Sequence, residues 1–179
     1  MKYLFLFFTS LVASLVSSCN KQDDPLDKFY WGEVTALKNG SAWEGRPRCL
    51  IDKPYEQGID FIFEMFNEQK FHRDNLFFFK IPNNIGNYQL SITEIRDIDS
   101  LQGATYHTSI DDGTSGDSYN LLNGIVDNQI IIDRKEGDEL WGTFQAAFVK
   151  DTTYMPEDPL SPDTVIFTNG RFHTKLLKE

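Results

Sequence analysis

The seven residues from 111 to 117, DDGTSGD, carry three carboxylates and two glycines in one short stretch. Asp111, Asp112 and Asp117 have the side chains that bind calcium, but calcium takes about six to eight oxygen ligands, more than these three residues supply. The ligand spacing of an EF-hand loop is not met either. A calcium site here would need backbone carbonyls or a second loop. The alternative interpretation is a solvated hairpin loop, because Gly, Ser and Asp favour turns.

Other residues with chemical potential are scattered. His72, His107 and His173 lie in separate segments and lack the short ligand spacings that are typical of zinc sites. A metal centre assembled from distant strands is one alternative, but we expect each histidine to face solvent or to bond to a cross-strand partner. The GxSxG motif of serine hydrolases is absent, so Ser115 is interpreted as a loop serine. No glycine-rich phosphate loop is visible, and no cofactor is predicted.

Cys19 follows an uncharged stretch, residues 3–16, and two serines. The stretch is shorter than the roughly 20 residues of a bilayer-spanning helix, and with Lys2 before it the pattern is typical of a secretory signal. The arrangement LVSSC resembles the bacterial lipobox, in which the cysteine is acylated and the signal is cut before it. The resemblance implies that residues 1–18 are a lipoprotein signal peptide and that Cys19 carries the lipid. An ordinary signal peptide with an incidental cysteine is the alternative.

The residues after the cysteine, NKQDDPLDK, are polar and lack apolar periodicity. We interpret residues 19–28 as the lipidated cysteine and a tether of about 30 Å when extended. The KQDD core resembles the export signals that send lipoproteins of Bacteroidota to the outer face of the outer membrane. The alternative is a plain polar linker on an anchor that faces the periplasm. Either way, the membrane is an expected partner through the lipid on Cys19.

Removal of the signal leaves 161 of the 179 residues, which is enough for one domain over 29–179. Lys2 is the only charge lost, so the formal net charge changes from −10 to −11. Nucleic acid and anionic lipid headgroups are therefore not expected as partners, because phosphate binding needs clustered Lys and Arg. With Cys19 acylated, Cys49 has no partner for a disulfide within the chain, and we expect it to be a small buried hydrophobic residue.

Short runs of aromatic and β-branched residues, separated by turn residues, predict an all-β fold. We expect a single antiparallel β-sandwich of about eight to ten short strands, with a curled β-barrel as the alternative. An Asn-Gly turn at 39–40 predicts a hairpin, and a second at 169–170 predicts another. A helical turn is predicted within 95–101. The expected strands are 33–37, 41–43, 59–66, 76–81, 88–93, 104–110, 118–125, 129–133, 139–149, 165–168 and 171–177.

The segment ELWGTFQAAFV, 139–149, alternates between an apolar face and a face that includes Trp141. Strand tryptophans more often pack in a core, but Trp141 stands opposite the apolar face, and aromatic surfaces are used to hold sugars. The proline-rich connection 150–163, which contains Tyr154, is long enough to act as a binding loop. Trp141 and Tyr154 are therefore the candidate binding residues.

Four motifs occur in order along the chain: NGSAWEG at 39–45, IPNNIGNYQL at 81–90, LWGTFQAAF at 140–148 and VIFTNGRF at 165–172. This series resembles small Bacteroidota lipoprotein domains of unknown function. The resemblance implies an all-β envelope lipoprotein and brings no catalytic residues. We therefore expect a lipid-anchored, non-enzymatic binding or structural module with an unknown protein or glycan ligand. The alternative is a small hydrolase or calcium-dependent module that uses the 111–117 loop.

Overall fold

The computed structural model describes residues 28–51, 58–91, 102–110, 115–153, 158 and 161–177. This part of the chain forms one ten-stranded sheet, so the predicted all-β class and strand number are confirmed. The helical turn predicted within 95–101 lies outside the described residues. The strands are β1 (Glu33–Lys38), β2 (Ser41–Ile51), β3 (Ile59–Phe66), β4 (His72–Ile81), β5 (Gly86–Gln89), β6 (Gly103–Ser109), β7 (Ser115–Leu121), β8 (Gln129–Glu136), β9 (Glu139–Lys150) and β10 (Thr164–Leu177).

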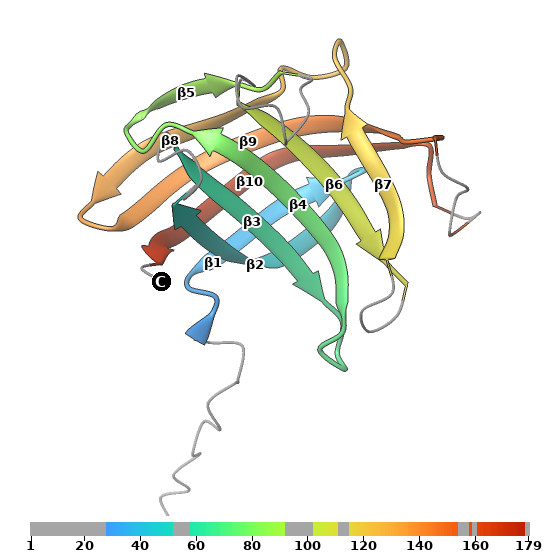
Figure 1. The fold of residues 1–179 in the computed structure, drawn as a ribbon, viewed down its shortest axis with the longest axis horizontal. Helices are drawn as coiled ribbons and strands as arrows, with labels where there is room; N and C mark the ends of the chain where they lie inside the picture. The colour runs from blue at the N-terminus through green and yellow to red at the C-terminus, as the bar shows by residue number, and fades with distance from the viewer. Residues whose placement is uncertain are drawn as a thin grey trace, which may run out of the picture.

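The sheet curls until its strand pairings form a ring (Figure 1). From β10 the pairings run through β2, β3, β4, β6, β7 and β9, and β9 pairs again with β10. Strands β8 and β5 extend the sheet from β9. A single ring-like sheet is compatible with both the sandwich and the curled barrel that the sequence leaves open. In the described part of the chain, no helix has the length and apolar character needed to cross a bilayer.

The ring closes where β10 meets β2. Strand β1 pairs with both β10 and β2. Near the start of β1, β10 and β2 also pair directly and in parallel, Leu176 with Cys49 and Leu177 with Leu50. Gly32, just before β1, has a φ of +94°, and a Cβ at this position would lie 1.9 Å from the carbonyl oxygen of His173. Glycine is required here because no other residue tolerates both the conformation and the close approach.

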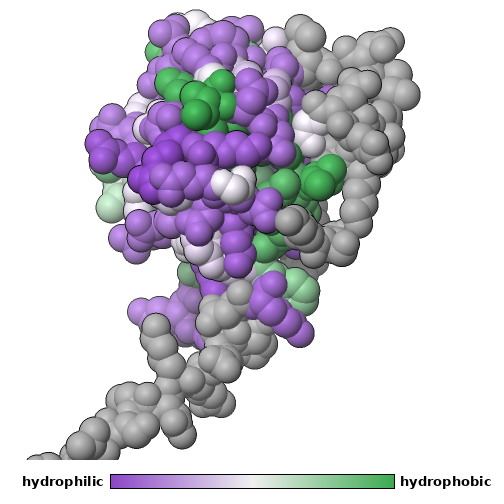
Figure 2. All heavy atoms as spheres, turned by 90° about the vertical axis from the view of Figure 1, so that its left-hand side faces the viewer, coloured by the Kyte–Doolittle hydropathy of each residue, from purple (hydrophilic) through white to green (hydrophobic). Residues whose placement is uncertain are grey.

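Aromatic side chains fill the ring. The ring of Phe63 lies within 5.6 Å of the rings of Phe78, Phe144 and Phe172, which come from three other strands. On β9 the predicted inward face is confirmed, because its alternate residues Leu140, Gly142, Phe144, Ala146 and Phe148 are buried. Cys49 is completely buried, as expected, and desolvation raises the pKa of its thiol far above the ordinary value. The surface in Figure 2 is mostly hydrophilic, with hydrophobic residues confined to small patches.

The Asn-Gly dipeptides at 39–40 and 169–170 form different structures. Asn39 and Gly40 both have positive φ and turn the β1–β2 hairpin, as predicted. Asn169 also has positive φ, but the predicted turn at 169–170 is wrong: β10 continues through it with a shifted register against β9. Gly170 faces inward, where an added Cβ would lie 2.6 Å from the ring of Phe144. The dipeptide therefore makes a bulge that brings the strand close to an aromatic side chain.

The bulge changes which residues of β10 face inward. Before it the buried residues are Val165 and Phe167, and after it they are Gly170, Phe172 and Thr174. Since side chains alternate across a strand, one extra residue exchanges the two faces. Arg171 and His173 consequently lie on the outer face of the sheet.

One carboxylate, Asp74, lies inside the apolar ring and is only 3% exposed. Lys38 Nζ lies 3.0 and 2.9 Å from its two oxygens, Trp43 Nε1 donates to it at 2.8 Å, and the Tyr106 hydroxyl donates at 2.5 Å. Burial, and then the nearby carboxylate, raise the pKa of Tyr106, which keeps its hydroxyl a donor. Asp74 therefore joins β1, β2, β4 and β6 through one satisfied polar cluster.

We predict that Asp74→Ala lowers the free energy of unfolding by about 3 kcal/mol, because it leaves several donors without their acceptor. Urea unfolding of the mature domain measures the change. Asp133→Ala on the exposed outer face is the control, with an expected effect within about 0.5 kcal/mol. Equal stability of the two variants would contradict the structural role of Asp74.

Candidate functional site

A hollow of about 540 Å³ lies on the outer face of the sheet, over β1, β10, β9 and β8. Strand register builds it from two rows of side chains. The first row runs Glu33, His173, Trp141, Arg134, and the second runs Thr35, Arg171, Thr143, each row crossing from β1 towards β8. Asp133 also lines the hollow. We call this hollow the outer groove.

Trp141 lies at the centre of a stack. The His173 ring is parallel to the indole within 14°, with 4.3 Å between ring centroids. The Arg134 guanidinium lies 3.9 Å from the indole centroid. Because His173 and Arg134 come from the strands on either side of β9, they cover the two faces of Trp141. Trp141 is half-buried, and with a group over each face it offers no free stacking surface to the groove.

The stack continues on β10 and at the N-terminal end of the domain. The Trp31 ring meets His173 edge-on at 4.8 Å, and Lys175 Nζ lies 5.0 Å from the Trp31 ring centroid. On its polar side, His173 Nε2 lies 2.9 Å from Glu139 Oε2. The imidazole is therefore fixed by two aromatic rings and one carboxylate. This arrangement gives the groove a rigid wall, since each group is held by contacts on more than one side.

Arg171 is the cation of the groove that is open to a ligand. It is exposed on the outer face of β10, with Thr35 and Thr143 as its cross-strand neighbours. Within the described residues it makes no hydrogen bond or ion pair, whereas Arg134 bonds to Glu136 at 2.9 Å. A guanidinium presents a planar fork of donors that matches a carboxylate or phosphate. The groove can therefore hold an anionic group at Arg171 and hydroxyl groups at the two threonines.

The other predicted site residues do not meet at this groove. Asp117 lies in β7 rather than in a loop, is buried, and has its Oδ2 3.1 Å from Lys150 Nζ. Ser115 is likewise the first residue of β7 and not a loop serine. Asp111, Asp112, Tyr154 and Cys19 lie outside the described residues. A cation at Asp117 would have to compete with the lysine. Among the described residues, no three His, Cys, Asp or Glu side chains gather as metal ligands do.

The three histidines bond across strands, as expected. His107 Nδ1 lies 3.1 Å from Ser118 Oγ, and His72 Nδ1 lies 3.1 Å from Ser109 Oγ. His173 bonds to Glu139, as described above. Each histidine thus has a partner on another strand.

His72 and Ser109 also invite comparison with a hydrolytic triad, because Glu64 lies on the far side of the imidazole. A triad needs its acid hydrogen-bonded to the histidine. Here Glu64 Oε1 is 3.6 Å from His72 Nε2, beyond hydrogen-bonding distance, and the carboxylate instead accepts from the Tyr30 hydroxyl and from Asn75 Nδ2. Because Glu64 bonds to these neighbours and not to His72, the three residues do not form a triad.

Arg171 and His173 were not identified as binding residues from the sequence. Trp141 could be singled out because its own strand alternates, whereas Arg171 follows an Asn-Gly pair that predicts a turn. Only the bulge and the β9–β10 register place it beside Thr143. No short-range signal in the sequence carries that information.

Comparison of the chain with protein-family models, with curated proteins and with solved structures found no match.

We predict that His107 makes stability fall in mild acid. Burial lowers the pKa of His107 from the ordinary 6.5. Well above pH 6.5 the imidazole is neutral in both the folded and the unfolded chain, so His107 does not reduce the free energy of unfolding there. Below that pH the unfolded chain takes up the proton more readily, and stability is lost as the pH falls through the folded pKa. Urea unfolding at pH 7.5 and pH 5 should show a smaller loss for His107→Gln than for the wild type. An identical loss would exclude this linkage.

Proposed function

We propose that the protein is a lipid-anchored cell-envelope protein whose mature chain begins at acylated Cys19. The support is the lipobox-like LVSSC sequence after an apolar stretch of signal-peptide length, and the resemblance to small Bacteroidota lipoprotein domains of unknown function. Several acyl chains on one residue give stable attachment, because each buried methylene contributes about 0.8 kcal/mol. The KQDD sequence supports attachment to the outer membrane with the domain at the cell surface. A periplasm-facing anchor is the alternative.

We further propose that the domain acts by binding rather than by catalysis. The observation that carries this proposal is Arg171, an exposed guanidinium without a partner among the described residues, in a hollow of about 540 Å³. A surface arginine usually extends into solvent, but this one is bordered by two threonines and the wall formed by His173 and Trp141. That setting supports a ligand with an anionic group and several hydroxyls.

Acidic glycans combine these features. A uronate carboxylate would pair with Arg171, ring hydroxyls would bond to Thr35 and Thr143, and the acids Glu33 and Asp133 would accept from further hydroxyls. Tyr154 is a second predicted contact from the connection between β9 and β10. A protein ligand that presents a carboxylate is the alternative partner. A small hydrolase or calcium-dependent module that uses residues 111–117 is the alternative function.

We predict that Cys19→Ala abolishes membrane attachment while the domain still folds, because Cys19 precedes the sheet. Detergent phase separation of extracts from expressing bacteria measures the partition. Wild-type protein should enter the detergent phase, and the variant should stay out of it. Wild-type protein found wholly in the aqueous phase would exclude the anchor.

We predict that Arg171→Ala weakens binding of glucuronate-containing oligosaccharides by about 1.5–3 kcal/mol, the range for hydrogen bonds to charged groups. Isothermal titration calorimetry measures the affinity, with uncharged glucose oligosaccharides as the ligand control. Arg73→Ala on β4 is the matched variant, since it removes an arginine away from the outer groove. Its affinity should equal that of the wild type.

Trp141→Ala should weaken the same binding by about 1–3 kcal/mol, the range for a central aromatic residue of an interface, because it removes part of the wall beside Arg171. Because half-buried Trp141 holds His173 in place, thermal unfolding must accompany the titration. No binding of acidic oligosaccharides by the wild type, or unchanged affinity in Arg171→Ala, would contradict the proposed ligand class. Hydrolysis of a substrate that is lost in Asp111→Ala would instead support the enzymatic alternative.

A further inference from the structure

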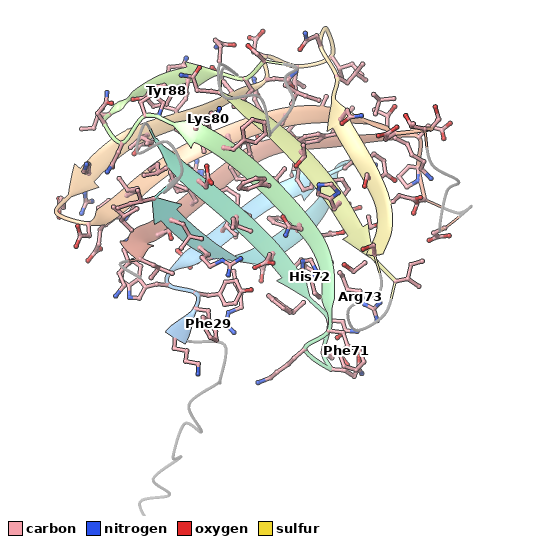
Figure 3. All side chains as sticks on the ribbon, in the orientation of Figure 1. Phe29, Phe71, His72, Arg73, Lys80 and Tyr88 are labelled. Atoms are coloured by element: carbon pink, nitrogen blue, oxygen red, sulfur yellow. The ribbon has the colours of Figure 1, made fainter. Side chains whose placement is uncertain are left out.

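One end of the ring exposes apolar side chains. Phe29, Phe71 and Ile110 are 49%, 38% and 37% exposed. Figure 3 shows Phe29 and Phe71 at the lower end of the molecule, whereas Lys80 and Tyr88 lie at the upper end. The other phenylalanines among the described residues are buried or half-buried.

These side chains belong to one continuous end of the structure. The Tyr30 ring packs edge-on against Phe66 at 5.6 Å, and the Phe66 ring lies 5.7 Å from His72. Phe29 directly precedes Tyr30, and Phe71 directly precedes His72. Ile110 directly follows Ser109, whose Oγ lies 3.1 Å from His72 Nδ1. We call Phe29, Phe71 and Ile110 the apolar rim.

Basic residues flank the two phenylalanines of the rim, although the chain as a whole has a formal net charge of −10 and Ile110 is followed in the sequence by Asp111 and Asp112. Lys28 precedes Phe29, and its Nζ lies 5.0 Å from the Phe29 ring centroid. Lys70 precedes Phe71, and Arg73 lies beside it at the start of β4 (Figure 3). Exposed aromatic side chains next to lysine and arginine are the composition of segments that lie in a membrane interface.

The N-terminal connection places this end near a bilayer. Lys28 is the first described residue, and it directly precedes Phe29. Only eight residues separate it from Cys19, so Lys28 lies within about 30 Å of the acylated cysteine whatever path the connection takes. The upper end of the ring is farther from Lys28, because β4 alone spans 10 residues, or about 33 Å.

We propose that the apolar rim docks on the phospholipid bilayer to which the chain is anchored, with Phe29, Phe71 and Ile110 in the headgroup region. The inference rests on the proposed lipid on Cys19, and it adds an orientation: the lower end of the ring contacts the membrane and the β5 end points away from it. Lys28, Lys70 and Arg73 would then lie at the level of the lipid phosphates.

Site-directed nitroxide labelling of the lipidated protein tests this orientation. Phe71→Cys and Phe29→Cys place labels on the rim, and Ile85→Cys places the control label just before β5, where Ile85 is 59% exposed. Cys49 is completely buried and Cys19 is acylated, so the introduced thiol is the reactive one. Each labelled protein is reconstituted into vesicles of phosphatidylethanolamine and phosphatidylglycerol, and collision with oxygen and with a water-soluble nickel chelate is measured.

The rim labels should collide several-fold more with oxygen, relative to the nickel chelate, than the label at residue 85. Vesicle flotation distinguishes failure of the lipid anchor from failure of the docking of the rim. Protein that floats with the vesicles but shows equal, water-like collision ratios at all three positions overturns the docking and leaves the anchor intact. Protein that does not float overturns the anchor and the docking together. Labels at 29 and 71 are independent, so misfolding of one variant, detected by its thermal unfolding, leaves the other decisive.

Discussion

The structure depends on β10, which pairs with β9, β1 and β2 and so closes the sheet into a ring. The bulge at Asn169 and Gly170 bends the strand and exchanges its faces, so that Phe167 and Phe172 both enter the same core, although the four residues between them would place them on opposite faces of a regular strand. Closure removes apolar side chains from water, since aromatic rings from many strands meet inside the ring.

The same bulge creates the outer groove. Because Phe172 and Thr174 turn inward after it, Arg171 and His173 turn outward and meet Thr143 and Trp141 of β9. The charged groups inside and outside the ring differ in their hydrogen bonding. Asp74 inside is fully engaged by Lys38, Trp43 and Tyr106, whereas Arg171 outside keeps its donors open to a ligand. A satisfied buried carboxylate stabilises the ring, and an open surface guanidinium is available for recognition.

Local patterns in the sequence account for much of the fold. The alternation over 59–66 predicts β3 with its observed bounds, and that over 139–149 predicts β9 to within one residue. Asn39-Gly40 and Asn169-Gly170 are alike in sequence, but the first forms the turn between β1 and β2. The second lies within β10, where Gly170 packs against Phe144. That difference arises from tertiary packing, which no local rule contains. For the same reason Trp141 was identifiable and Arg171 was not. Cys19, Asp111, Asp112 and Tyr154 lie outside the described residues, and their roles stay predictions.

Closure of the ring by the bulged β10 can be detected by nuclear Overhauser effects between backbone protons. A closed ring should give contacts between Leu176 and Cys49 across the parallel junction, and between Phe172 and Gly142 beyond the bulge. Contacts between residues 165–168 and residues 171–174, with none between Leu176 and Cys49, would show a hairpin at Asn169-Gly170 and an open sheet, and would contradict it.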